Sequence, residues 1–202
     1  MPVNNLTNEM PWSLKETVAP VEEPITTAEA KLHLRVDHGD EDAYIDTLVA
    51  AARQYIELVT RRSLVNTTFT LKLDAYPTEI RPPRSPLSSV TSITYVDTDG
   101  NTQTEASSVY NVDTDTEPGR ISLAFDQSWS DTREQNNAVV VTFVAGYGAA
   151  ASNVPAALRE VVKMLTAHYY EFRQPVISGT IATKIPMHIE SLIWMHRVLE
   201  AP

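Results

Sequence analysis

Residues 41–62 read EDAYIDTLVAAARQYIELVTRR, and this stretch dominates the expected fold. Its apolar side chains recur every three or four residues, at Ile45, Leu48, Ala52, Ile56 and Val59, which is the spacing of one face of an α-helix. Acidic residues stand in the first turn and arginines in the last, an order that complements the helix dipole. The stretch therefore predicts a long amphipathic helix that buries one stripe.

Further helices are expected on both sides of this one. Residues 26–29 read TTAE, a capping box in which Thr26 and Glu29 satisfy free amides at the start of a short helix that reaches about residue 36. Pro155 opens a later helix, because its fixed φ suits a first turn, and the residues RQP at 173–175 end it. A last short helix is expected over about 187–198.

The middle of the chain has the pattern of short strands. Residues 67–73 (TTFTLKL) and 90–96 (VTSITYV) alternate and are rich in β-formers. The second run is followed by DTDG at 97–100, where Asp-Gly is a strong hairpin signal. Further strand-like pieces lie at 101–104, 110–112, 120–123 and 138–144. Short strands at this close spacing predict a compact antiparallel β-module.

The predicted fold class is α+β: an α-helical bundle with an inserted antiparallel β-module, an extended N-terminal arm and a C-terminal docking helix. The arm covers residues 1–24, the helical core 25–66 and 149–175, the β-module 67–148, and the linker with the docking segment 176–202. The arm holds four of the 13 prolines. It also holds Trp12, which either covers a groove on its own subunit or reaches a neighbour.

Composition narrows the possible partners. The chain has 26 acidic and 16 basic residues, a net charge of −10, which opposes tight binding of nucleic acid. It has no cysteine, so neither a disulfide nor a thiolate metal site is possible. The first ten residues do not resemble a signal peptide, and no apolar run approaches the roughly 20 residues of a membrane span. We expect a soluble protein that binds no membrane.

No catalytic, metal or cofactor site is predicted. Gly146 and Gly148 form only a Gly-x-Gly, which lacks the context of a phosphate-binding loop. The five histidines contain no HExxH pair, and no serine elbow occurs. Acidic pairs such as Asp97 with Asp99, or Asp113 with Asp115 and Glu117, lie in polar turn-like stretches. A small carboxylate-dependent hydrolase is therefore only the remote alternative.

The C-terminal segment is the strongest candidate for binding a partner. Its expected helix is apolar on nearly all sides, and Trp, Met and Arg are enriched where proteins meet. We predict that it docks on another chain and that deletion from Ile185 onward leaves a folded subunit; the alternative is a helix folded back on its own subunit. The predicted docking residues are Ile185, Pro186, Ile189, Leu192, Ile193, Trp194, Met195, Arg197 and Val198.

Several stretches in a fixed order carry a family resemblance. They are AKLHLRV (30–36), AARQYIE (51–57), TRR (60–62), PLSSVTSI (86–93), YVD (95–97), DG (99–100), VAGYG (144–148), VPAAL (154–158), HYYE (168–171), IP (185–186) and RV (197–198). Together they resemble the head–tail connector or head-completion adaptor proteins of long-tailed double-stranded DNA phages and related gene-transfer particles. The resemblance spans about residues 25–198, and the arm lies outside it.

The resemblance implies a role as well as a fold. Such adaptors are made in the host cytoplasm and form a homo-oligomeric ring of twelve subunits under the portal protein, in the virion neck. It implies that the closing segment engages the portal, that helices pack laterally between subunits, and that a stopper or tail protein follows. DNA passes through the channel without specific binding. The alternative within this class is another neck ring, a stopper or a tail terminator.

Overall fold

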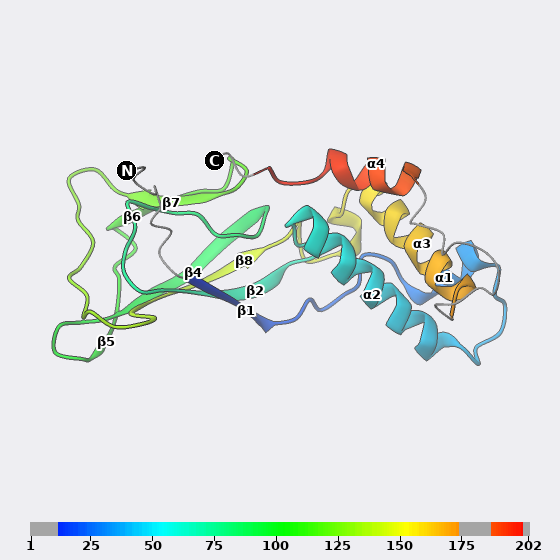
Figure 1. The fold of residues 1–202 in the computed structure, drawn as a ribbon, viewed down its shortest axis with the longest axis horizontal. Coiled ribbons are helices and arrows are strands. Elements are labelled where there is room, and N and C mark those ends of the chain that lie inside the picture. Colours follow the sequence, from blue (N-terminus) through cyan, green and yellow to red (C-terminus); the bar gives the residue numbers. More distant parts are fainter. Residues whose placement is uncertain (1–11, 174–186, 200–202) are drawn as a thin grey trace, which may run out of the picture.

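The helices gather at one end of the molecule and the strands at the other, so the molecule is elongated (Figure 1). The computed structural model describes residues 12–173 and 187–199. The chain runs from a first strand into two helices, passes through the remaining strands, and returns to the helical end for its last two helices. The predicted α+β class is confirmed.

The helical end contains α1 (Thr27–Leu34), α2 (Asp42–Thr60), α3 (Ala156–Glu171) and α4 (Met187–Met195), with a short 3-10 turn at Ala151–Asn153 before α3. The predicted capping box is present at α1: Thr26 Oγ1 accepts a bond from the Glu29 amide at 3.1 Å, and the Glu29 carboxylate accepts one from the Thr26 amide at 2.9 Å. On α2 the buried stripe includes Val49, whereas Leu48 is only half-buried.

The strands of the described residues form two antiparallel sheets. The five-stranded sheet has the order β1-β2-β8-β4-β5 and the three-stranded sheet the order β3-β7-β6. Their bounds are β1 Trp12–Val18, β2 Thr67–Leu73, β3 Glu79–Ile80, β4 Leu87–Val96, β5 Thr102–Thr104, β6 Tyr110–Asp113, β7 Arg120–Leu123 and β8 Val139–Ala145. The predicted Asp-Gly turn joins β4 to β5: Gly100 has φ +92° and its amide donates to the Asp97 carbonyl.

Each end of the molecule has its own apolar core. The helical core contains side chains of α1, α2, α3 and α4, together with Leu64 and Val65 beyond α2. The second core lies between the sheets and includes Phe69 of β2 and Phe143 of β8, whose paired rings stack with centroids 5.6 Å apart. Because α4 contributes to the helical core, it packs on its own subunit.

The start of the chain differs from the predicted free arm. Residues 12–18 form β1, an edge strand paired with β2 from Trp12↔Leu73 to Val18↔Thr68. Farther along, Glu23 binds the buried Arg53 of α2 at 2.8 Å. Local sequence showed an extended conformation here but not the backbone pairing, because most side chains of β1 are exposed and show no buried face. Residues 1–11 lie outside the described part.

Among the helices that the structure describes, none combines the length and the apolar character that crossing a lipid bilayer requires.

Candidate interaction surfaces

The acidic turn at residues 97–100 is held by its own hydrogen bonds. Asp97 Oδ1 accepts bonds from the amides of Asp99 and Asn101 at 3.1 and 2.8 Å, and its Oδ2 accepts one from Gln103 Nε2 at 2.9 Å. These bonds, the one from Gln103 foremost, lower the pKa of Asp97 below its ordinary value. These three hydrogen bonds tie the Asp97 side chain to the turn that it opens.

The second acidic stretch is likewise occupied by structural contacts. Asp113 accepts a bond from Arg120 at 2.9 Å and from the Asp115 amide at 3.0 Å, and its pKa is lowered, mainly by Arg120. Glu117 binds Arg62, which lowers the Glu117 pKa. Within residues 12–173 and 187–199, no cluster of three His, Asp or Glu side chains is placed to hold a metal ion.

The predicted docking segment is divided between the core and the surface. Ile189, Ile193 and Val198 are 2%, 3% and 8% exposed, and the two isoleucines belong to the helical core, against which Leu192 packs in part. The burial of these residues agrees with the alternative prediction, in which the helix folds back on its own subunit. The local sequence does not show which face of the helix is buried, because apolar residues lie on nearly all of its sides. Ile185 and Pro186 lie outside the described residues.

The opposite face of the segment is exposed. Trp194 and Met195 are 62% and 71% exposed, and Leu199, which was not predicted, is 70% exposed. Arg197 is exposed too, and its guanidinium carbon lies 5.1 Å from the centroid of the Trp194 ring. Large apolar side chains adjacent to an arginine are typical of protein interfaces. Of the predicted docking residues that the structure describes, Trp194, Met195 and Arg197 are exposed and so accessible to a partner.

Arg62 anchors the C-terminal segment, a role that sequence reasoning missed. Its guanidinium binds both carboxylate oxygens of Glu117, at 2.7 and 2.5 Å, and its Nε donates to the His196 carbonyl. Nearby, the Val198 amide donates to the Thr60 carbonyl at 3.0 Å. From the local sequence, Arg62 was expected only to complement the dipole of α2. The local sequence could not reveal its partners, which lie 55 and 134 residues away. α4 is thus fixed with its Trp194 face outward.

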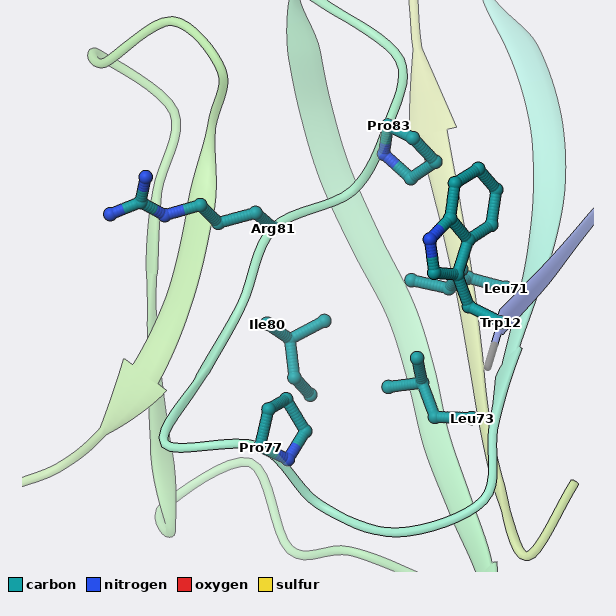
Figure 2. Close-up of a pocket in the computed structure, with 7 residues that line it drawn as sticks. All are labelled: Trp12, Leu71, Leu73, Pro77, Ile80, Arg81 and Pro83. Carbon is teal, nitrogen blue, oxygen red and sulfur yellow. The ribbon is translucent and has the colours of Figure 1, made fainter. Parts of the chain in front are cut away.

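A second apolar surface surrounds Trp12. The residue is 55% exposed, and its ring forms one wall of a pocket between the first strands and the segment that carries β3 (Figure 2). The pocket is lined by Trp12, Leu71, Leu73, Pro77, Ile80, Arg81 and Pro83. Trp12 therefore contacts a groove of its own subunit, one of the two predicted options, while about half of it stays accessible.

The described residues thus define an α+β protein whose distinctive groups are exposed apolar side chains on a rigid frame. Residues 24–117 match the family model described as phage gp6-like head-tail connector protein. Together with the structural matches that follow, this match makes the chain similar to phage head–tail connector proteins. The comparison with curated proteins found no match.

Solved structures with the same fold come from gene transfer agent (GTA) particles. A chain in the neck of an empty GTA particle, computed with C6 symmetry, matches with a TM-score of 0.79 and 27% identity. A chain in the virion of a native GTA particle matches with 0.78 and 28%, and one in a native neck computed with C12 symmetry with 0.75 and 26%. Each match covers 94% of this chain and 97% of the other.

Proposed function

We propose that the chain forms the adaptor ring that joins the portal to the tail in the virion neck. The observation that carries this proposal is the near full-length likeness to chains of GTA neck structures, at 26–28% identity. Two of those necks were computed with C6 and C12 symmetry, which suits a homo-oligomeric ring of twelve subunits. The adaptor role is preferred to that of a stopper or tail terminator because the sequence stretches between residues 30 and 198 resemble those of adaptors and occur in the same order.

The exposed face of α4 is the proposed portal-docking surface. Trp194 and Met195 protrude from α4, whose other face is buried in the subunit, and Arg197 follows just beyond its end. The backbone that carries them is already fixed, so binding a partner does not have to order it. Ile189, Ile193 and Val198 support this surface from beneath. The subunit needs no reacting group for this role, because assembly is driven by buried surface.

The β-module carries most of the net charge. Residues 97–137 hold nine Asp or Glu and two Lys or Arg, which gives −7 of the chain's −10. Acidic surfaces repel phosphates. We propose that this charge keeps the genome from adhering as it passes through the ring.

The position in the particle is tested by electron microscopy of particles from a producing strain and from a strain lacking this chain. We expect a ring of this fold directly below the portal, and DNA-filled heads without tails when the chain is absent. Density for the chain at the tail-proximal end of the neck would instead support the stopper or tail terminator. Complete absence of the chain from the neck would overturn the proposal.

The docking surface is tested by Trp194→Ala combined with Met195→Ala. We expect portal capture by the purified variant to fall at least tenfold while its circular dichroism spectrum is unchanged. Leu58→Ala is the matched control, because Leu58 is 70% exposed on α2 and lies outside the proposed surface. Unchanged capture by the double variant would contradict the docking role. Deletion from Ile185 onward is a poorer test, since it removes Ile189 and Ile193 from the core.

A further inference from the structure

Phe125 is displayed on the surface by a fixed turn. Its side chain is 99% exposed, more than any other large apolar side chain of the described residues. The turn follows β7: the Ala124 amide donates to the Val109 carbonyl at 2.8 Å, the Gln127 amide donates to the Ala124 carbonyl at 3.2 Å, and Asp126 has φ +58°. An ordered, fully exposed phenylalanine is the kind of side chain that anchors an interface.

The pocket beside Trp12 has the size and lining for such a side chain. It has a volume of about 110 Å³ and is open to the surface, whereas a closed apolar cavity that holds one benzene molecule has about 150 Å³. A phenylalanine ring would therefore enter it in part and leave one edge at the open mouth. Trp12 and Pro83 lie along one side and Ile80 and Pro77 along the other (Figure 2). Arg81 belongs to the lining, with its side chain directed away from Trp12 and 59% exposed.

The two features fit each other in shape and in charge. Phe125 is followed by the exposed Asp126, and the pocket carries Arg81 at its edge, where the Arg81 guanidinium also binds Glu79 of its own subunit at 2.6 Å. Phe125 does not fill the pocket of its own chain, since almost all of its surface is accessible. A closed ring requires two different patches on each subunit, repeated until the rotation closes. A chain that carries both the protruding Phe125 and an apolar pocket beside Trp12 meets that requirement.

We propose that Phe125 of one subunit inserts into the Trp12 pocket of the next subunit, with Asp126 facing Arg81 at the pocket edge. The inference rests on the ring of the proposed function and names one of its lateral contacts. The contact also covers the accessible half of Trp12. Because the carboxylate and guanidinium lie at the rim, they set the register, while the buried ring supplies most of the attraction.

The chain has no cysteine, so an engineered pair tests the contact directly. Asp126→Cys combined with Arg81→Cys places one thiol on each side of the proposed interface, at two exposed positions, and keeps Phe125 in place. A disulfide requires Cα atoms within about 7 Å. After mild oxidation of purified particles, we expect a non-reducing gel to show a ladder of multimers rising by one subunit. Asp126→Cys with Val21→Cys is the control, because Val21 is 93% exposed, and it should stay monomeric.

The outcomes separate this inference from the proposed function. A chain that is present in the particles but never forms the ladder overturns the Phe125 contact and leaves the neck role intact. A chain that is absent from the particles overturns the neck role; oxidation of the concentrated purified double variant then decides the contact, and a monomer band there overturns it as well.

A photo-crosslinker identifies what occupies the pocket. We expect benzophenone attached to the Arg81→Cys variant to label peptides around residue 125 of a second copy. Labelling of the portal, of a tail protein or of residues 1–11 instead would overturn the proposal. Phe125→Ala should abolish the label on the second copy, and Phe125→Leu, which keeps an apolar knob, should retain part of it.

Discussion

At the scale of single residues, Arg62 joins three parts of the chain. It follows α2, binds Glu117 in the β-module and donates to the His196 carbonyl beyond α4. The Arg62 side chain is 10% exposed and that of Glu117 is 43% exposed. The pair is therefore only partly shielded from water, and it acts mainly by fixing the C-terminal segment against the rest of the molecule.

Glu117→Gln should weaken this anchor in a pH-dependent way. Arg62 lowers the pKa of Glu117 below its ordinary value of 4.5, so the folded state binds this proton less readily than the unfolded chain does. The stabilisation is present above about pH 4.5 and is lost as the pH falls through the lowered pKa. At pH 7 we expect a loss of about 1 kcal/mol, discounted for the exposure of Glu117.

Thermal unfolding of both proteins between pH 7 and pH 3 checks this expectation. The gap in the free energy of unfolding should close as the pH falls. Glu134→Gln, a change in an exposed loop, controls for the general effect of removing one acid from a chain of net charge −10. A gap that is the same at every pH would show that the charge of Glu117 contributes nothing.

At the scale of the element, α4 has two faces with different roles. Ile189 and Ile193 are one turn apart and are buried in the helical core, whereas Trp194 and Met195 are exposed. The core face holds the helix on its subunit and so presents the other face in a fixed orientation. β1 is a comparable case, since its backbone pairs with β2 although most of its side chains are exposed.

Single substitutions should separate the two faces of α4. We expect Ile193→Ala to reduce the free energy of unfolding by about 2–4 kcal/mol, because it leaves a cavity in the core. Trp194→Ala should change it by no more than about 0.5 kcal/mol. Urea denaturation followed by circular dichroism measures both. Similar losses for the two variants would mean that Trp194 also supports the fold.

At the scale of the whole molecule, the two cores meet where α2 leads into β2 and β8 leads toward α3. The Gly146 amide donates to the Pro86 carbonyl, and the Asn66 amide donates to the Gly148 carbonyl, both at 2.9 Å. Gly146 has φ +146°, and a Cβ there would lie 2.5 Å from the Asn66 nitrogen. Only glycine permits this close approach of the two backbones.

Gly146→Ala should therefore weaken both ends of the molecule together. We expect a loss of about 1–3 kcal/mol from the positive φ and the backbone clash. The ellipticity at 222 nm reports mainly on the helices. In a Trp194→Phe background the remaining tryptophans are Trp12 of β1 and Trp129, which stacks on Tyr76 with ring centroids 4.5 Å apart, so their fluorescence reports on the β end. The two melting curves should shift by the same amount. A shift at one end alone would show that the cores unfold independently.

A matched control for that experiment is Gly39→Ala. A Cβ at Gly39 would meet only Asp42 Oδ2 at 3.7 Å, an ordinary contact. Its melting temperature should lie close to that of the wild-type protein, so a large shift in this variant would indicate a general cost of replacing glycine.

The sequence by itself determined the local elements and showed the resemblance to head–tail connectors. Helix α2, the capping box of α1 and the turn at Gly100 were predicted because periodicity, capping and turn chemistry act over a few residues. The acidic stretches were predicted to form turns for the same reason, and Asp97 and Asp113 accept hydrogen bonds from backbone amides two residues on. The order of the matched stretches pointed to the head–tail connector family, which the family model and the neck structures support.

Only the tertiary structure decided which surfaces are free. It buried Ile189 and Ile193, left Trp194 exposed, paired β1 with β2 and brought Arg62 to Glu117. When a helix is apolar on every side, its sequence does not show which face packs inward. An ion pair between residues 55 positions apart produces no pattern in the local sequence. Which side chains are buried and which strands pair depend on how whole elements pack on one another, because the contacts involved join residues that are distant in the chain.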